Sequence, residues 1–292
     1  MGRAVFTGRV QTGGESLRPI DPLILSQSRT TFSFLVLLLA LLVLRGRRRL
    51  ALPRADVFRM FSVGVLGVAV SNYFYYLAIQ RTNVATAIIL QYTAPVWILA
   101  YTVARGLQKP TLQRVLATVV ALTGIALVVG VFGSGGLRLD PSGVIMALIA
   151  SFSFAFYNLA GHSILARYDR WIVLLYVILG ASLFWILVNP PWKIEAAHYG
   201  FSQWLFLFVF SIISVLGPFA FYFAGLQHLE PTRAVIVSCL EPVFSIAIAA
   251  LLLGERLHSL QSFGIVLVLA AIIVVQLPGK VRETMNLVEP ME

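Results

Sequence analysis

The sequence predicts an all-α integral membrane protein, and three observations lead to this fold class. Of its 292 residues, 59% are hydrophobic and 12% are charged, whereas a soluble domain is typically about 45–50% apolar and about 25% charged. The apolar residues gather into nine long segments, and the chain matches itself at an offset of 147 residues. The composition argues against a soluble enzyme, a nucleic-acid-binding protein and a disordered scaffold.

Nine segments are long and apolar enough to cross a bilayer as helices, which takes about 20 residues each. In chain order they are 22–44, 58–80, 83–104, 112–132, 142–165, 171–189, 202–226, 232–253 and 260–277. The loops between them are short and contain turn-forming residues, as at 132–136 and Asn189-Pro190-Pro191. We therefore expect no separate soluble domain.

Basic residues alternate between the two sets of loops. Loops 45–59, 105–114 and 167–170, together with Arg233 and the tail 280–282, hold fourteen Lys and Arg residues. The opposite set holds four, which are Arg81, Arg138, Lys193 and Arg256. Because cytoplasmic loops carry the excess of positive charge, the first set and the C-terminus are predicted to be cytoplasmic. The Arg-rich composition without a targeting peptide indicates a bacterial inner membrane.

The match at an offset of 147 residues indicates an internal repeat. It pairs Phe74-Tyr75 with Phe221-Tyr222 and Pro95-Val96 with Pro242-Val243. An odd number of spans separates the copies, so the copies point in opposite directions across the membrane. Inverted repeats of this kind are typical of transporters with a substrate site near mid-membrane. An old duplication that is kept only for packing is the alternative.

The repeat also predicts a helix ahead of span 22–44, as the partner of span 142–165. Residues 5–8 match residues 158–161, which are only the last turns of that span. We therefore expect most of the first helix to be missing from this chain, through a mis-assigned start or a real truncation.

Two groups of motifs resemble EamA-type members of the drug/metabolite transporter superfamily. The second repeat contains Leu240-Glu241-Pro242-Val243-Phe244, followed by Leu-Gly-Glu at residues 253–255. The first repeat contains Tyr73-Phe-Tyr-Tyr-Leu-Ala78 and then Leu90-Gln-Tyr-Thr-Ala-Pro95-Val96. The first repeat lacks Leu-Gly-Glu and has residues 105–109 in its place, so no role is carried over there.

This resemblance covers roughly residues 2–277 and implies a ten-helix fold of two five-helix inverted repeats around a central cavity. About nine full spans are present here, since the first helix is mostly missing. The implied organisation is a first repeat at 1–132, an inverted second repeat at 141–278 and a cytoplasmic tail at 279–292. Members of the family move small metabolites and often export amino acids.

Polar and aromatic side chains that share helix faces inside the spans are the candidate cavity residues. They are Asn72, Tyr75, Tyr76, Gln91, Tyr157, Asn158, Tyr222, Ser238 and Glu241. Such a cavity suits a zwitterion, or a polar molecule with a flat apolar body. The alternative is that these groups form hydrogen bonds between helices and line nothing.

Four residues carry further hypotheses. Glu241, the one acidic residue deep inside a span, either carries a proton or binds a substrate amine, or else satisfies backbone groups freed by Pro242. Pro95 and Pro242 bend their spans, as hinges beside the site or as fixed kinks. Arg29 either snorkels to the interface or contacts a substrate carboxylate.

The function predicted from these features is secondary transport of small metabolites, and most of all amino acids, in the export direction that the family implies. Exporters of nucleosides, sugars or drug-like molecules are the alternatives, and an integral-membrane enzyme or a channel is disfavoured. The single cysteine, Cys239, and the lack of a phosphate-binding loop predict no metal, cofactor or ATP site. The expected partners are a small-molecule substrate and the lipid bilayer, not nucleic acid, with proton coupling or exchange as the energy source.

Overall fold

A computed structural model describes residues 11–12, 15–16, 20–131, 137–253 and 258–277. Within these residues, eight helical stretches are long and apolar enough to cross a membrane, and Leu112–Val128 is a shorter apolar helix. The eight stretches overlap eight of the nine predicted spans, and the shorter helix overlaps the ninth, predicted at 112–132. The expected remnant of a first helix, the tail 279–292 and the Gly254-Glu255 pair lie outside the described residues.

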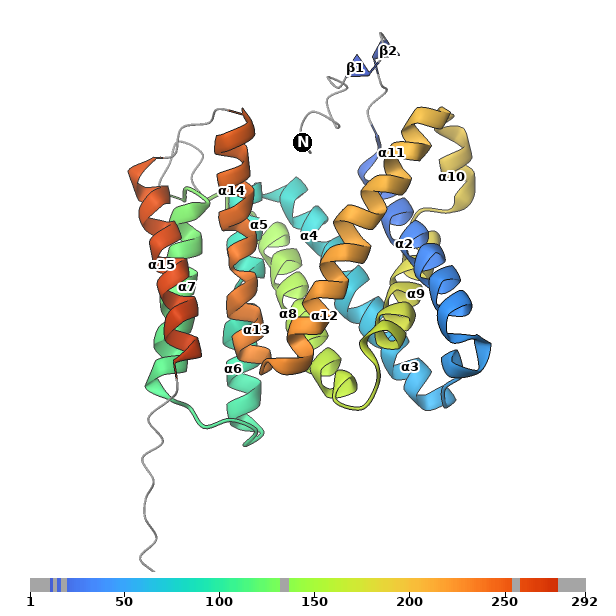
Figure 1. The fold of residues 1–292 in the computed structure, drawn as a ribbon. Coiled ribbons are helices and arrows are strands. Elements are labelled where there is room, and N and C mark those ends of the chain that lie inside the picture. Colours follow the sequence, from blue (N-terminus) through green and yellow to red (C-terminus); the bar gives the residue numbers. More distant parts are fainter. Residues whose placement is uncertain (1–10, 13–14, 17–19, 132–136, 254–257, 278–292) are drawn as a thin grey trace, which may run out of the picture.

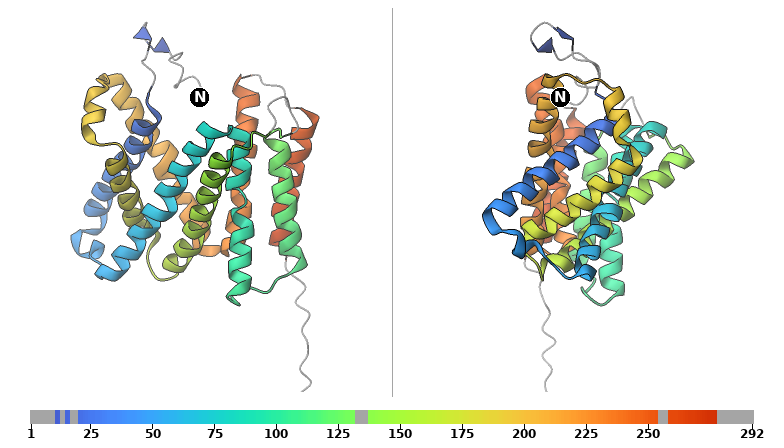
Figure 2. Two further views of the ribbon diagram at one scale, coloured as in Figure 1. Left: turned by 180° about the vertical axis from the view of Figure 1, so that it is seen from behind. Right: turned by 90° about the vertical axis from the view of Figure 1, so that its right-hand side faces the viewer.

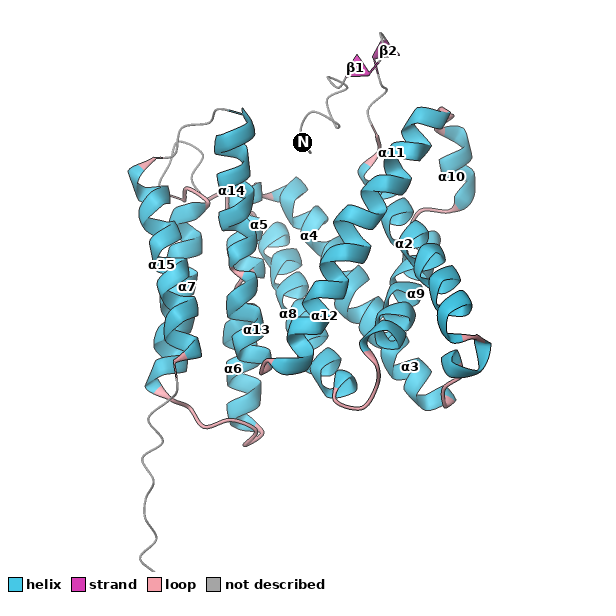
Figure 3. Cartoon of the chain, viewed as in Figure 1, coloured by secondary structure: helices cyan, strands magenta, loops and turns pink. Residues whose placement is uncertain are grey.

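Helices make up almost all of the described chain (Figure 3). In order, the elements are β1 (Gln11–Thr12), β2 (Glu15–Ser16), α2 (Pro22–Arg45), η1 (Arg47–Leu50), α3 (Arg54–Ser62), η2 (Val63–Ala69), α4 (Val70–Arg81), α5 (Val84–Gln91), α6 (Ala94–Ala104), α7 (Leu112–Val128), α8 (Pro141–Leu165), α9 (Arg170–Val188), α10 (Pro191–Ala196), α11 (Phe201–Ser211), η3 (Ile212–Leu216), α12 (Gly217–His228), α13 (Pro231–Ser238), α14 (Leu240–Leu253) and α15 (Ser259–Gln276). The antiparallel pair β1–β2 and the short helix α10 were not predicted.

Short polar side chains begin several of the helices. The Asp21 Oδ1 atom accepts a hydrogen bond from the backbone N–H of Leu23 at 2.7 Å, and Asn83 and Asp140 cap α5 and α8 in the same way. Such caps satisfy backbone donors that have no partner within the helix. Asp169 caps α9. Burial raises the pKa of its carboxyl group, but the hydrogen bonds from Arg45 and from the Trp171 N–H have the larger combined effect, so the pKa lies below its usual range.

Four of the spans are interrupted, and the interruptions recur at the repeat offset. The π-helical segments η2 and η3 end at Ala69 and Leu216, and α5 and α13 end at Gln91 and Ser238. Each pair of residues is 147 positions apart. The predicted bends are therefore breaks between two helices, with Pro95 and Pro242 in the first turns of α6 and α14.

Helices at equivalent positions of the two halves pack against each other at the two sides of the molecule (Figure 1). On one side α7 lies along α15 and on the other α2 lies along α9, with opposite chain directions in each pair; the views in Figure 2 agree. The α7–α15 contact depends on glycine, because a Cβ atom on Gly264 would lie 2.7 Å from the carbonyl oxygen of Gly124. The interrupted spans and α8 fill the space between the two sides.

Charged loops gather at the end of the molecule that is lower in Figure 1. The loops after α2, α6, α8 and α12 all lie there, and so do the predicted cytoplasmic segments 45–59, 105–114 and 167–170. The ion pairs that join described residues are also at this end: Arg45–Asp169 at 2.6 Å, Arg59–Asp56 at 3.5 Å, and Arg114–Glu230 at 2.7 Å with Arg233 close by. We refer to this end as the basic end.

Candidate functional site

A cavity of about 670 Å³ lies between the two halves, in the volume range of small-molecule sites. Its walls come from α2, η2, α4, α5, α7, α8, η3, α12, α13 and α14. Val84, the first residue of α5, lines the cavity and is 53% exposed at the end opposite to the basic end. The cavity therefore extends from mid-membrane toward that opposite end.

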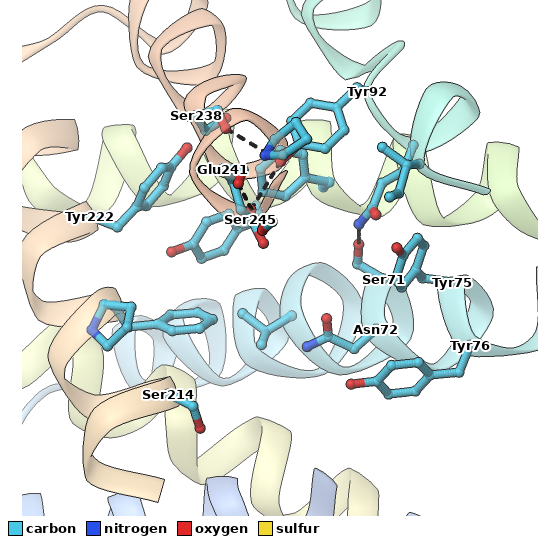
Figure 4. A pocket seen from close by; sticks show the side chains of 18 of the residues that line it. Ser71, Asn72, Tyr75, Tyr76, Tyr92, Ser214, Tyr222, Ser238, Glu241 and Ser245 are labelled. Atoms are coloured by element: carbon cyan, nitrogen blue, oxygen red, sulfur yellow. Dashed lines mark hydrogen bonds between the residues drawn. The ribbon is translucent and has the colours of Figure 1, made fainter. Parts of the chain in front are cut away.

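Eight of the nine predicted cavity residues line this space, and so does Pro242. Figure 4 shows several of the eight, with Tyr222 and Glu241 among those labelled. The eight are Asn72, Tyr75, Tyr76, Gln91, Tyr157, Tyr222, Ser238 and Glu241. Asn158 differs from the prediction. It is fully buried behind the wall, where its Oδ1 atom accepts a hydrogen bond from Tyr222 and its Nδ2 atom donates to the Phe154 carbonyl at 2.8 Å. Pro95 is buried outside the lining.

Glu241 is held by a tyrosine from the other half of the molecule. The Tyr92 hydroxyl lies 2.9 Å from Glu241 Oε2 and 3.3 Å from the Ser238 carbonyl oxygen. That carbonyl is four residues before Pro242, which has no N–H to donate to it. The backbone group freed by the proline thus faces Tyr92, and the Glu241 side chain is exposed at the cavity wall.

Hydrogen bonds hold the side chains of Ser71 on α4 and Gln91 on α5 in place beside the cavity. The Ser71 hydroxyl donates to the Ala150 carbonyl of α8 at 3.0 Å, and Gln91 Nε2 donates to Ser71 Oγ at 3.4 Å (Figure 4). Nearby, Thr93 and Ser151 share a hydrogen bond of 2.9 Å. These bonds connect α5 to α4, α4 to α8, and the N-cap of α6 to α8 beside the cavity.

An aromatic wall stands around Tyr157. Its ring stacks on Phe154, Tyr222 and Phe223 with centroid separations of 6.0, 5.7 and 5.7 Å. The backbone of η2 approaches closely here, because a Cβ atom on Gly67 would lie 2.9 Å from the Cβ atom of Tyr157. Of these rings, Phe154, Tyr157 and Tyr222 line the cavity, whereas Phe223 is fully buried outside the lining.

Further residues line the cavity. Arg29, for which the sequence left open a contact with a substrate carboxylate, is one of them. Tyr92 and Ser214 are also in the lining, and the sequence did not identify them. The Arg29 Nε atom and the Ser214 Oγ atom are buried without a hydrogen-bond partner. The only sequence signal was the charge of Arg29 inside an apolar segment, which fits a cavity position as well as an interfacial one.

The basic end of the cavity is closed. Ala94, Ile98, Ala155 and Val235 form a buried apolar cluster between α6, α8 and α13. Beyond this cluster, Glu230 accepts from Arg114 at 2.7 Å and from Gln108 at 3.4 Å. Gln108 in turn accepts from the Thr232 hydroxyl at 3.1 Å. We call these four polar residues the Glu230 clasp; it joins the loop after α6 and the first turn of α7 to the start of α13.

No cluster of three or more His, Cys, Asp or Glu side chains that could hold a metal ion occurs in the described ranges. The chemistry available in the cavity is that of hydroxyls, amides, one carboxylate and one guanidinium. These groups bind and orient a solute by hydrogen bonding and charge.

The relatives found by comparison with known proteins are all named as transporters. The chain is 27% identical over 232 residues to "Uncharacterized inner membrane transporter YicL" of Salmonella typhimurium, covering 78% of this chain and 76% of that protein. It is 27% identical over 216 residues to "Uncharacterized transporter YxxF" of Bacillus subtilis, covering 72% and 68%. An "Uncharacterized transporter" of Archaeoglobus fulgidus is 24% identical over 215 residues, covering 72% and 75%.

The fold and the family agree with these relatives. A solved crystal structure of a protein superposes with a TM-score of 0.74 at 20% identity and covers 88% of both chains, which shows a shared fold. The model of the EamA-like transporter family matches twice, over residues 8–130 and 141–277. With its membrane-spanning helices, its central cavity and a family model that covers nearly the whole length, this chain belongs to the EamA-like transporter family.

Proposed function

We propose that this protein is a secondary transporter that exports amino acids or closely related metabolites across the bacterial inner membrane. The observation that carries the proposal is the cavity of about 670 Å³ at mid-membrane, lined by tyrosines, amides and Glu241. Phenols, amides and a carboxylate can hold the polar groups of a small solute, and the Tyr157 wall can hold its apolar part.

In this proposal the two repeats, 1–132 and 141–278, move relative to each other around the cavity. Support comes from the paired interruptions of the spans at the repeat offset, which lie beside the cavity in both halves. Broken helices near mid-membrane are a common construction of substrate sites in secondary transporters. The basic end and the tail 279–292 face the cytoplasm in this arrangement.

Glu241 is the proposed proton-coupling group. An ionisable side chain within a span is costly, so it is a functional candidate where it faces a cavity. Its contact with Tyr92 at 2.9 Å gives it one hydrogen-bond partner, while its exposed side chain leaves room for a proton or a substrate amine.

Counterflow in proteoliposomes tests the proposal. Vesicles that contain the purified protein are loaded with pools of unlabelled amino acids, and uptake of labelled amino acids is followed. We expect uptake with one pool and none in protein-free vesicles. Folded protein that exchanges no amino acid would contradict the amino-acid proposal, and nucleosides, sugars and drug-like cations would then be assayed.

The same assay tests coupling. Glu241→Gln keeps the size of the side chain and removes its titration. We expect the variant to exchange substrate at a rate that varies less with pH than the wild-type rate does. A pH profile identical to that of the wild type would leave Glu241 with a structural role only.

A further inference from the structure

Arg29 places a positive charge inside the membrane at the wall of the cavity. It is the eighth residue of α2, about 10 Å along the helix from its first residue at 1.5 Å per residue. Its Nε atom is buried without a hydrogen-bond partner, and no ion pair joins Arg29 to another described residue. A guanidinium at such a depth needs hydrogen-bond acceptors, and a ligand in the cavity can supply the one that Arg29 Nε lacks.

Ser214 supplies a second unfilled donor on the neighbouring element. It lies on η3, which packs against α2, and the Ser33 hydroxyl of α2 donates to the Ser211 carbonyl at 3.0 Å just before η3. The Ser214 Oγ atom is buried without a partner. The Arg29 guanidinium and the Ser214 hydroxyl line the same cavity. Both are donors, and a carboxylate only accepts hydrogen bonds.

Glu241 is the complementary group on the far wall. Figure 4 draws Ser214 and Glu241 on opposite sides of the cavity. No ion pair joins Glu241 to Arg29 among the described residues, so the two charges lie more than 4 Å apart. Phe219 and Tyr157 line the space with them and form an aromatic contact at 6.1 Å.

We propose that Arg29, with Ser214, binds the carboxylate of the substrate and that Glu241 binds its ammonium group, so that the site selects dipolar solutes. This inference rests on the proposed transport function and names the recognition within it. An inorganic or organic anion would satisfy Arg29 but would meet the Glu241 carboxylate. A simple cation would satisfy Glu241 but would meet the Arg29 guanidinium. A solute with both charges pairs with Arg29 and with Glu241, whereas a solute with a single charge is repelled by one of the two residues.

Competition against amino-acid counterflow tests the inference with three probes of one shape. Phenylalanine carries both charges, phenylalaninamide lacks the carboxylate, and 3-phenylpropanoate lacks the ammonium group. We expect wild-type protein to prefer phenylalanine at least about tenfold over each analogue, which corresponds to about 1.4 kcal/mol. Glycine betaine is dipolar but has no free amine, and its own exchange is measured in a separate counterflow assay.

Two variants test separately the recognition of the carboxylate and of the ammonium group. Arg29→Gln should remove the preference for phenylalanine over its amide and keep the preference over 3-phenylpropanoate. Glu241→Gln should remove the preference for phenylalanine over 3-phenylpropanoate and keep the preference over phenylalaninamide. Arg29→Lys keeps the charge and should restore part of the first preference, and Thr123→Ala, on the exposed face of α7 outside the cavity lining, should change neither.

The outcomes separate this inference from the proposed function. If wild-type protein exchanges amino acids but Arg29→Gln weakens phenylalanine and its amide equally, the inference is overturned and the transport function stands. If amino acids are not exchanged but glycine betaine is, the amino-acid proposal fails and dipolar selection stands. If neither is exchanged, both are overturned.

Discussion

At the scale of single residues, the Tyr92 hydroxyl has one proton and two acceptors. It is 2.9 Å from the Glu241 carboxylate and 3.3 Å from the Ser238 carbonyl, and the residue is 7% exposed. An ionised Glu241 is the nearer and stronger acceptor. The Ser238 carbonyl, whose helical partner position is occupied by Pro242, is the second and more distant acceptor. Tyr92 thereby connects Glu241 to the break between α13 and α14.

Tyr92→Phe should destabilise the protein by about 0.5–1.5 kcal/mol, because it removes the donor to two acceptors that are not fully buried. Pro242→Ala restores an N–H opposite the Ser238 carbonyl, so the cost of Tyr92→Phe should be smaller in that background, by about 0.5–1 kcal/mol. Thermal unfolding in detergent of the wild type, the two single variants and the double variant measures this coupling.

Tyr222→Phe is the matched control for this cycle. Tyr222 also donates from a cavity wall, but its acceptor is Asn158 on α8, remote from Pro242. The Tyr222→Phe substitution should therefore cost the same in the wild-type background and in the Pro242→Ala background. Equal costs for Tyr92→Phe in the two backgrounds would show that Tyr92 does not serve the freed carbonyl.

At the scale of elements, the Glu230 clasp and the apolar cluster beneath the cavity keep the basic end shut. The clasp joins the loop after α6 to α13, so opening this end requires the Arg114–Glu230 pair at 2.7 Å to break. Arg114 is 16% exposed and Glu230 is 43% exposed, so the pair is screened by solvent and its contribution is about 1 kcal/mol. Such a loss changes a conformational equilibrium roughly fivefold.

Glu230→Gln should therefore raise the population that is open at the basic end. Val235→Cys, introduced with Cys239→Ala, places a reporter thiol in the buried cluster. Its reaction with a thiol reagent added from the basic end should be roughly fivefold faster in the Glu230→Gln variant. Asp169→Asn removes an ion pair of the same end on the α2–α9 side and should leave the rate unchanged. Equal rates in all three proteins would exclude the clasp as a gate.

The sequence predicted the elements better than their interruptions. Long apolar segments located all nine spans, since burying them in a bilayer depends on composition and length. The π-helical segments and the exact breaks at Tyr92 and Cys239 were not predicted. They depend on which backbone N–H bonds to which carbonyl, and the hydropathy of the residues does not reveal this. Asn72 lines the cavity and Asn158 does not, although both lie on polar helix faces. Which face meets a cavity and which meets a neighbouring helix depends on packing between distant segments.

At the scale of the whole molecule, near-symmetry in structure is combined with asymmetry in charge. Equivalent helices of opposite direction pack as α2–α9 and α7–α15, so the two ends of the bundle are built alike. The loops of the basic end nevertheless hold most of the Lys and Arg residues. A fold with this internal symmetry can be inserted in either direction, and the charge difference decides which one.

This orientation is tested with two cysteine substitutions that are matched in exposure and leave the charge unchanged. Leu107, at the basic end, is 67% exposed, and Trp192, at the opposite end, is 69% exposed. The native Cys239 is buried and should contribute little background. In intact cells, a membrane-impermeant thiol reagent should modify Trp192→Cys and should reach Leu107→Cys only after the membrane is permeabilised. The opposite pattern would place the basic end outside, and the cavity would then open toward the cytoplasm. Modification of both in intact cells would mean that the chain inserts in both directions, so that the charge difference does not determine its orientation.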